Sequence, residues 1–485
     1  MAEINYEKLK FKSGLEIHQQ LDSSKLFCNC PSILRGDEPD FEIKRKLQLV
    51  AGEFGEVDIA AKHESGKNKE FIYQSYKNST CLVELDEEPP HFINQEALKI
   101  GIQIAILMNM KIIPITQIMR KTVIDGSNTS GFQRTVMVAR DGFIETSFGK
   151  VRIDFLYLEE DSARIIKKEN NCDIYRLDRL GIPLVEIVTA PDFKTPEHAK
   201  ETALKIGEIL RSCKVRRGIG TIRQDVNISI REENRVEMKG MQDMDIFISA
   251  INNEILRQKE LSDMKEPTLM EVRNVLDDGN SEFMRPLPGK SRMYPETDLP
   301  LLKISREFID DIKKNLPKLK SENREDLKKH GLNEEMIKLI LNEDKIEEFK
   351  NLLRILNQPQ LVAKSMLIYQ NEIAKKFGKT EEDIKRISEI INNSLEYILM
   401  AVKQNQISEN DIKEVMERIA KGISMTEAIK IEKADLSFME ERVLDLINSK
   451  PGLSENAYMG LVMKEFKGKI SGNEAMEIIK KVMRK

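Results

Sequence analysis

The chain has 485 residues, of which 40% are hydrophobic and 33% are charged, and its formal net charge is −4. This composition is typical of a globular protein, and the length predicts two to four domains because one core rarely serves more than roughly 300 residues. The small net charge does not indicate a generally basic nucleic-acid-binding protein, although local patches can remain hidden in it. With no long apolar run, no signal-peptide core and an odd count of five cysteines, we expect a cytoplasmic protein without membrane spans or disulfide bonds.

The first predicted strand covers residues 14–21, where Leu15 and Ile17 alternate with Glu16 and His18. Alternation with a period of two indicates a half-buried strand. Its polar face would place a carboxylate and an imidazole about 6.5 Å apart and pointing the same way. Two such groups could bind one metal ion or one reacting phosphate. A solvent-exposed edge strand explains the pattern equally well.

A cysteine pair follows this strand. Cys28 and Cys30 resemble half of a zinc site, but only Cys81 follows before Cys172. Because zinc usually takes four ligands, we do not expect a zinc site here.

The candidate phosphate-binding loop is the stretch 119–134, which combines basic and small hydroxyl residues with two glycines. The chain has neither a Walker A motif nor a complete Gly-x-Gly-x-x-Gly motif, so an ATP molecule would need another loop. Backbone donors together with cations suit phosphate, although most loops of this composition are only turns. Downstream, Asp141-Gly142 predicts the turn of a β-hairpin between strands at 136–139 and 143–145.

Two further acidic segments stand out. Glu159 and Glu160 follow the strand pattern of residues 151–157, and Glu186 lies inside an apolar run at 182–188. A lone carboxylate in such a run must be paired, protonated or bound to a cation.

The alternative for Glu186 is an ion pair with Arg176 or Arg179. Together, Glu16, Glu160 and Glu186 could instead form an oxygen-rich site for Mg²⁺, with His18 as an unusual ligand or as a group that orients water. A magnesium site of this kind would favour phosphoryl transfer.

The next predicted strands are residues 224–231 and 235–239, which form an antiparallel pair with one apolar and one polar face. A plain solvated face would explain the polar side equally well. Just before them, residues 215–223 place three arginines around two glycines. This segment could contact ATP or RNA phosphates, or could simply cap a helix.

The overall prediction is an α+β protein with three domains. Residues 1–300 would form a mostly antiparallel sheet domain, which ends in a proline-rich string at 284–300 that disfavours helix. Residues 301–430 would form a helical domain, marked by amphipathic runs such as 387–402. Residues 431–485 would form a small helical tail with a modest excess of basic residues, for which a solvated helix face is a slightly better explanation than RNA binding.

Seven strings occur in an order that resembles the E-type subunits of archaeal glutamyl-tRNA(Gln) amidotransferases, which are relatives of the bacterial and organellar B-type subunits. They run over most of the first 300 residues: Gly14–Leu21, Cys81–His91, Met119–Thr135, Leu158–Asp161, Arg176–Ile187, Arg217–Ser229 and Arg285–Gly289. The strings at 84–91 and 127–134 are more similar to the E type than to the B type.

This resemblance implies an ATP- and Mg²⁺-dependent carbon–nitrogen ligase with a cradle-shaped N-terminal domain. The glutamate of misacylated Glu-tRNA(Gln) would be phosphorylated, and ammonia would then displace the phosphate. The implied catalytic residues are Glu16, His18, Glu160 and Glu186; the metal ligands are these four and Glu159, with Glu160 preferred to Glu159. The implied cofactor-binding residues are Arg120, Lys121, Ser127, Arg134, Asp225, Asn227 and Lys239.

The resemblance also implies a hetero-oligomer with an asparaginase-like partner, the D-type subunit, because this chain has no amidase signature and no evident glutaminase cysteine. One departure is expected: residues 256–284 are too few for the domain that E-type subunits usually carry there. Two alternatives stay open at this point. One is a B-type subunit with A-type and C-type partners, acting on Glu-tRNA(Gln) or Asp-tRNA(Asn), and the other is a non-catalytic tRNA-binding protein.

Overall fold

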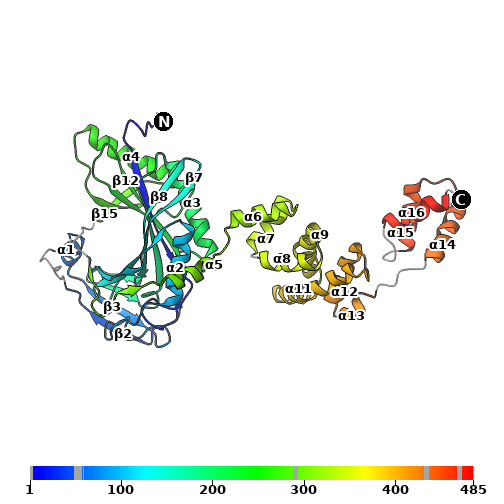
Figure 1. The fold of residues 1–485 in the computed structure, drawn as a ribbon, viewed down its shortest axis with the longest axis horizontal. Helices are drawn as coiled ribbons and strands as arrows, with labels where there is room; N and C mark the ends of the chain where they lie inside the picture. Colours follow the sequence, from blue (N-terminus) through cyan, green and yellow to red (C-terminus); the bar gives the residue numbers. More distant parts are fainter. Residues whose placement is uncertain are drawn as a thin grey trace. The chain divides into compact units, whose positions relative to one another are not determined.

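The computed structural model describes residues 4–48, 57, 59–287, 293–343, 345–430, 436–466 and 472–483. The chain divides into two compact units, Met1–Leu319 and Lys320–Lys485. The first is rich in strands and the second is helical (Figure 1), which confirms the α+β class. The first unit extends beyond residue 300 because α5 (Arg306–Lys314) packs against α2 (Gln95–Leu107). Residues 288–292 of the proline-rich string lie outside the described residues.

An 11-stranded sheet dominates the first unit. Its order is β15-β14-β13-β12-β1-β11-β8-β7-β6-β16, with β4 paired to β7. Every neighbouring pair is antiparallel except β13 and β14. The strands are β1 (Lys12–Gln20), β4 (Lys111–Ile112), β6 (Ile118–Thr122), β7 (Phe132–Thr146), β8 (Gly149–Glu160), β11 (Pro183–Thr189), β12 (Ile222–Ser229), β13 (Val236–Lys239), β14 (Glu271–Val275), β15 (Ser281–Pro286) and β16 (Met293–Pro295).

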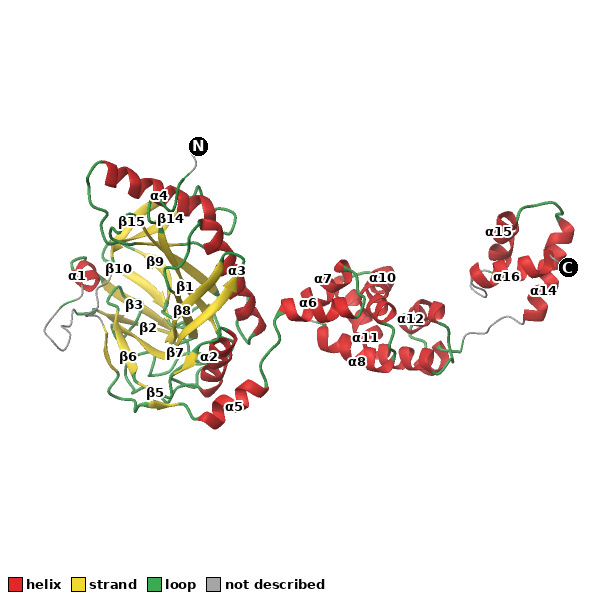
Figure 2. Cartoon of the chain, turned by 45° about the horizontal axis from the view of Figure 1, so that its top comes forward, coloured by secondary structure: helices red, strands yellow, loops and turns green. Residues whose placement is uncertain are grey.

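Helices cover one face of this sheet. α2 contacts β7 and β8, α3 (Pro196–Ser212) contacts β1 and β7, and α4 (Phe247–Asp263) contacts β12 (Figure 2). Leu15 and Ile17 of β1 are fully buried in the core that forms there. Because successive side chains on a strand point to opposite faces, Glu16 and His18 lie on the face that these helices leave uncovered.

A second, four-stranded sheet has the order β2-β3-β10-β9. Its strands are β2 (Phe41–Arg45), β3 (Glu70–Ser75), β9 (Arg164–Lys168) and β10 (Cys172–Arg176), and α1 (Ile59–Ser65) precedes β3. Phe71, Tyr73 and Tyr175 pack together on this sheet. A short pair, β5 (Ile115–Thr116) and β17 (Leu302–Lys303), completes the strands described in the unit.

The hairpin turn predicted at Asp141-Gly142 is wrong, because β7 continues through these residues and turns only after Thr146. The pairing of β7 with β8 shifts register between Met137 and Ala139, as happens at a β-bulge. A side chain at Gly142 would approach Met110 Cγ to 2.3 Å, so the glycine permits a close approach rather than a turn. The predicted antiparallel pair at 224–239 is confirmed as β12 and β13.

The second unit contains two separate hydrophobic cores among its described residues. The first is formed by α6 (Lys320–Lys329), α7 (Glu334–Asn342), α8 (Ile346–Ile355), α9 (Pro359–Ala363), the π-helix η2 (Lys364–Tyr369), α10 (Gln370–Phe377), α11 (Glu381–Lys403), α12 (Ile412–Ala420) and α13 (Met425–Ala428). The short 3₁₀-helix η3 (Glu409–Asp411) precedes α12 and has no buried residue. The second is formed by α14 (Leu436–Ser449), α15 (Glu455–Glu465) and α16 (Gly472–Met483). The predicted helical run at 387–402 lies within α11.

The proposed boundary between a helical domain and a tail, at residues 430 and 431, adjoins residues 431–435, which lie outside the described residues. The division into 301–430 and 431–485 therefore stays a prediction. Over the part of the chain that the structure describes, no helix has both the length and the apolar composition that a membrane crossing requires.

Candidate active site

The polar face of the large sheet bears a cavity of about 410 Å³. β1 lies between β11 and β12, and the register of these pairs brings distant parts of the sequence together. Glu16 lies opposite Asp225 of β12, and His18 lies opposite Glu186 of β11. All four side chains line the cavity, so the alternating pattern of residues 14–21 is part of a shared site rather than an exposed edge.

The first group of possible metal ligands is His18, Glu159 and Glu186, whose ligand atoms all lie within 4.8 Å of one another. His18 Nε2 is 3.7 Å from Glu186 Oε2. Lys121 forms an ion pair with Glu159 and lies 3.6 Å from Glu186 Oε2. Gln133 donates a hydrogen bond of 3.1 Å to Glu159 Oε2. The alternative explanation for Glu186 was an ion pair with Arg176 or Arg179; the structure shows Lys121 and His18 beside it instead.

The second group is Glu16, Asp225 and Glu237, again with ligand atoms within 4.8 Å of one another. Lys239 Nζ lies 2.5 Å from Asp225 Oδ2 and 2.6 Å from Glu237 Oε1. Asn227 donates a hydrogen bond of 3.0 Å to Glu16 Oε1. Asp225, Asn227 and Lys239, which the resemblance implies, are therefore assembled around Glu16.

Negative charge exceeds what the local cations neutralise. Burial raises the pKa of Glu16, and Glu237 and Glu186 raise it further. Burial and the charge of Glu186 also raise the pKa of Glu159. Burial acts in the same direction on Glu186, but Lys121 and His18 outweigh it and hold the pKa of that carboxyl well below its ordinary value. Carboxyl groups with raised pKa values in one cavity favour the binding of an additional cation.

Strand parity separates Glu159 from Glu160. Glu159 pairs in register with Leu184 and shares the cavity face with Glu186, whereas Glu160 pairs with Pro183 and points to the opposite face. The preference for Glu160 as the carboxylate that joins Glu16, His18 and Glu186 is therefore corrected. Glu160 instead pairs with Arg134 at 3.3 Å.

The same parity removes two predicted phosphate-binding residues from the cavity. In the β6–β7 pair, Arg120 lies opposite Arg134. The next residue of β6, Lys121, lies opposite Gln133 and points to the other face. Arg134 Nε lies 2.8 Å from Glu296 Oε2 and Arg120 Nη2 lies 2.5 Å from Glu296 Oε1. Both guanidinium groups are thus neutralised away from the cavity lining, whereas Lys121 remains part of it.

The loop between β6 and β7 contributes Asp125 and Ser127 to the cavity lining. The Ser127 backbone N–H and hydroxyl donate to Asp125 Oδ1 at 2.9 and 2.6 Å. Gly126 has a φ of +89°, and a side chain there would lie 2.2 Å from the ring of Phe71. Tyr73 donates to the Gly126 carbonyl at 2.8 Å, so the second sheet fixes the position of this loop.

Two further arginines of the cavity were not among the site residues expected individually. Arg223, the last arginine of the segment 215–223 that was considered for phosphate contact or helix capping, lines the cavity and forms an ion pair of 2.9 Å with Asp161 Oδ1. Arg285 also lines the cavity. Burial raises the pKa of Glu237, but the charges of Lys239 and, to a smaller extent, Arg285 outweigh it and lower that pKa. Strand alternation could have indicated Arg223, two residues before Asp225.

Comparison with known proteins places this site in a family. A family model described as the GatB/GatE catalytic domain matches residues 11–310, which contain the sheet and every residue of the cavity. The chain therefore belongs to the GatB/GatE family.

Within that family, its relatives include proteins named as the E subunit of glutamyl-tRNA(Gln) amidotransferase. The protein of Methanocaldococcus jannaschii is 36% identical over 99% of this chain and 100% of its own length. That of Methanococcus vannielii is 34% identical over 96% and 97%, and that of Methanosarcina barkeri is 33% identical over 99% and 99%.

The alignment with the M. jannaschii protein spans 644 positions, far more than the 485 residues of this chain. The relative therefore contains sequence that this chain lacks. In the structure, α4 is followed by β14 after residues 264–270 alone, which leaves no room for the expected inserted domain at that place.

Proposed function

We propose that the chain is the catalytic subunit of an enzyme that converts Glu-tRNA(Gln) into Gln-tRNA(Gln) with ATP, Mg²⁺ and ammonia. The observation that supports this most strongly is one cavity in which two groups of side chains that could bind a metal ion lie beside lysine and arginine side chains. Such a cavity suits the transfer of a phosphoryl group. The relatives described above are named for this tRNA and this class of reaction.

The glutamate side chain needs activation because a carboxylate has no good leaving group. In the first step, a carboxylate oxygen of the glutamyl group attacks the γ-phosphorus of ATP, and ADP leaves with the electrons of the broken bond. In the second step, ammonia attacks the acyl carbon, inorganic phosphate leaves, and the new amide nitrogen loses a proton. The main contribution of the protein is positioning and charge stabilisation.

The side chains present fit Mg²⁺, which prefers carboxylate and amide oxygens. Glu16, Asp225 and Glu237 offer one set of ligands, and Glu159 and Glu186 with His18 offer another. The side-chain amide of Asn227 donates through its nitrogen to Glu16, while its buried Oδ1 has no hydrogen-bond partner among the described residues. That oxygen therefore remains available as a further ligand. Bound Mg²⁺ would neutralise charge on the phosphate oxygens.

The cations of the cavity would bind the phosphates directly. Burial lowers the pKa of Lys239, but Asp225 and Glu237 outweigh it and raise that pKa above its ordinary value, so the ammonium group stays charged at neutral pH. Lys121 and Arg223 line the same cavity. Ser127 adds a hydroxyl group and a loop that the second sheet fixes. Among the predicted phosphate ligands, we retain Lys121, Ser127 and Lys239 and exclude the two arginines that pair with Glu296.

Ammonia would come from a partner. We propose an asparaginase-like D-type subunit in a hetero-oligomer, because the relatives that the chain matches are named as E subunits. Co-purification tests this assignment: an asparaginase-like chain supports it, whereas an amidase with a short third chain would support the B-type alternative.

The decisive experiment is reconstitution of the purified full chain with Glu-tRNA(Gln), ATP, Mg²⁺ and an ammonium salt, followed by analysis of the aminoacyl group. We expect Gln-tRNA(Gln) to form without a partner subunit, since ammonia from the added salt replaces the ammonia that the partner would deliver. Glu16→Gln and Glu186→Gln should abolish phosphorylation and leave tRNA affinity nearly unchanged.

Glu232→Gln is the matched control and should behave as wild type. Glu232 is exposed, and the one ion pair described for it is with the exposed Lys10, at 3.3 Å. Turnover at the wild-type rate by either cavity variant would contradict the proposed role of the carboxylates. Absence of Gln-tRNA(Gln) with all components present would contradict the proposed reaction.

A further inference from the structure

Two tyrosines of the second sheet hold the backbone of the loop between β6 and β7. Tyr73 of β3 lies directly opposite Tyr175 of β10 in the register of these parallel strands, so both side chains point to the same face of the sheet. The Tyr73 hydroxyl donates to the Gly126 carbonyl and the Tyr175 hydroxyl donates to the Asp125 carbonyl, each at 2.8 Å. Two neighbouring donors therefore meet two consecutive peptide groups of the loop.

The surroundings of the two hydroxyl groups keep them in place and protonated. Tyr73 is fully buried and Tyr175 is 6% exposed, and the ring of Phe71 packs against both of their rings. Burial, reinforced by the charge of Asp125, raises the pKa of both tyrosines above its ordinary value. Both hydroxyl groups therefore remain hydrogen-bond donors at neutral pH.

The next two carbonyls of the loop also have donors. The Ala163 N–H donates to the Ser127 carbonyl at 2.8 Å, and the Gly131 N–H donates to the Asn128 carbonyl at 3.1 Å. Together with the two tyrosine contacts, these bonds satisfy four consecutive carbonyls, from residue 125 to residue 128.

Most N–H groups of the same loop segment lack such partners. The Ser127 N–H donates to the Asp125 side chain, whereas the N–H groups of Gly126, Asn128 and Thr129 have no hydrogen-bond partner among the described residues. Asn128 and Thr129 are nevertheless buried, at 1% and 5% exposure. Because buried N–H groups without a partner are rare in folded proteins, these groups are available to a ligand.

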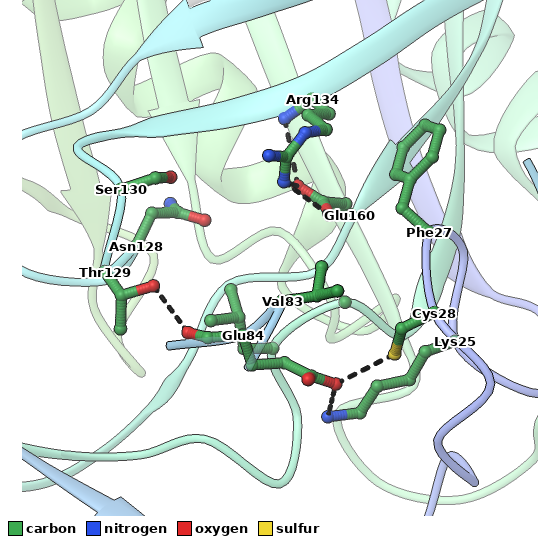
Figure 3. A pocket seen from close by; sticks show the side chains of 12 residues that line it. Lys25, Phe27, Cys28, Val83, Glu84, Asn128, Thr129, Ser130, Arg134 and Glu160 are labelled. Carbon is green, nitrogen blue, oxygen red and sulfur yellow. Dashed lines mark hydrogen bonds and ion pairs between the residues drawn. The ribbon is translucent and has the colours of Figure 1, made fainter. Parts of the chain in front are cut away.

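The held carbonyls fix the direction of the available N–H groups. In a trans peptide the C=O and N–H bonds point in opposite directions, and the described chain contains no cis peptide bond. The N–H groups of Gly126 and Asn128 share their peptide units with the carbonyls of residues 125 and 127, so they point away from the donors that hold those carbonyls. The Thr129 hydroxyl tethers the far part of the loop, because it donates to the Glu84 carbonyl at 2.6 Å (Figure 3).

We propose that Tyr73 and Tyr175 are positioning residues that orient this loop so that its unpaired N–H groups bind a phosphate group of ATP. Binding of ATP belongs to the function proposed above, on which this inference rests; the role of the two hydroxyl groups is additional to it. Successive N–H groups around a left-handed residue form anion-binding concavities, and Gly126, with a φ of +89°, supplies that residue. Lys121 and Arg223 line the cavity beside the loop and bring positive charge to it.

The two hydroxyl groups would act through the fraction of molecules whose loop has the binding orientation. Without its donor, a carbonyl is free to turn towards solvent, and the N–H group of the same peptide unit turns away from the phosphate. The apparent affinity falls in proportion to the fraction of molecules that remain competent. One hydrogen bond is worth about a factor of five in an equilibrium constant, so each hydroxyl group sets an upper limit of about that size on the change.

The first test measures binding of the non-hydrolysable ATP analogue adenylyl imidodiphosphate, with Mg²⁺, to the full chain by titration calorimetry. Tyr73→Phe and Tyr175→Phe remove only the hydroxyl groups, and the double variant should raise the dissociation constant about fivefold or more. The KM for ATP should rise in parallel, whereas the KM for Glu-tRNA(Gln) should stay unchanged. Tyr76→Phe is the matched control, because Tyr76 is fully buried just after β3 and donates to the Asp37 carbonyl, outside the loop, at 2.6 Å.

The second test follows the loop directly by hydrogen exchange of a peptide that contains residues 123–131. In the wild type, adenylyl imidodiphosphate and inorganic tripolyphosphate should slow exchange in this peptide, and adenosine should not. In the double variant, exchange there should be faster before any ligand is added, while peptides of α2 exchange as in the wild type. A merely structural role of the tyrosines would instead speed exchange across the whole sheet domain and would not separate ATP from tRNA.

Three results would overturn the inference. The first is a double variant that binds the analogue with wild-type affinity, and the second is a wild-type loop whose exchange does not change when the analogue binds. The third, wild-type protein that does not bind the analogue, would also contradict the proposed use of ATP. By contrast, wild-type protein whose loop is protected by the analogue but which forms no Gln-tRNA(Gln) would contradict the proposed reaction and support the role of the loop.

Discussion

Replacing Lys121 by methionine tests the electrostatics of the cavity most directly. Methionine keeps the length of the side chain and removes the charge between Glu159 and Glu186. At an effective dielectric constant of about 20, an ammonium 3.6 Å from Glu186 contributes about 4.6 kcal/mol of Coulomb attraction. Two carboxylates whose oxygens lie within 4.8 Å of each other would repel by at least about 3.5 kcal/mol. Because desolvation of Lys121 is also relieved, we expect a net loss of about 3 kcal/mol in stability at neutral pH.

The pKa of Glu186 determines how the stability difference between wild type and variant depends on pH. The pKa of Glu186 lies well below its ordinary value in the folded chain, so this carboxylate stabilises the fold above the unfolded pKa of about 4.3. That contribution is lost as the pH falls through the lower folded pKa. Lys121→Met removes the charge that does most to lower the pKa of Glu186. The difference in stability between wild type and variant should therefore be large near pH 7 and should shrink only as the pH falls below about 4.3, towards the folded pKa of Glu186.

The assay is urea unfolding followed by circular dichroism and tyrosine fluorescence, since the chain has no tryptophan. The exposed Lys111→Met is the control and should change stability by less than about 0.5 kcal/mol. Mg²⁺ should stabilise the Lys121→Met variant more than wild type, because the ammonium group occupies the space between two potential ligands. An equal loss of stability at pH 7 and at a pH well below 4 would refute this reasoning and would indicate lost packing instead.

Three further outcomes are expected. Glu159→Gln should weaken Mg²⁺ binding about tenfold or more in titration calorimetry, whereas Glu160→Gln should leave it nearly unchanged; the reverse pattern would restore the ligand set expected from the sequence. Gly126→Ala should lower stability by about 2 kcal/mol in thermal unfolding, because its φ is +89° and the new Cβ would meet Phe71; an unchanged midpoint would show that the loop adapts. Deletion of residues 431–485 should weaken tRNA binding and leave the unfolding transition of the first unit in place, and unaltered affinity would mean that the tail does not hold tRNA.

The polar face of the large sheet was largely predictable because strand alternation is a local property. Leu15 and Ile17 had to face a core, so Glu16 and His18 had to share the other face. Glu186 could be recognised because a charge within an apolar run needs a partner. These features depend on residues one or two positions apart, which the sequence shows directly.

The choice between Glu159 and Glu160 needed the tertiary structure. Both lie at the end of the same strand, and only the register of β8 against β11 decides which one faces the cavity. A shift of one residue exchanges the two faces, and the bulge between β7 and β8 shows that this sheet does not keep one uniform register. In the same way, the register of β6 against β7 places Lys121 in the cavity and Arg120 outside it.

Cys28, Cys30, Cys81 and Glu84, whose Sγ and carboxylate atoms all lie within 4.8 Å of one another, are a stronger case of this dependence. The sequence determined the α+β class, the order of the elements and the acidic residues of the polar face, because hydrophobic periodicity encodes them. It did not determine that Glu84 joins Cys28, Cys30 and Cys81, because these residues lie in irregular segments that have no period to read. Only the folding of those segments over the sheet brings the four side chains together.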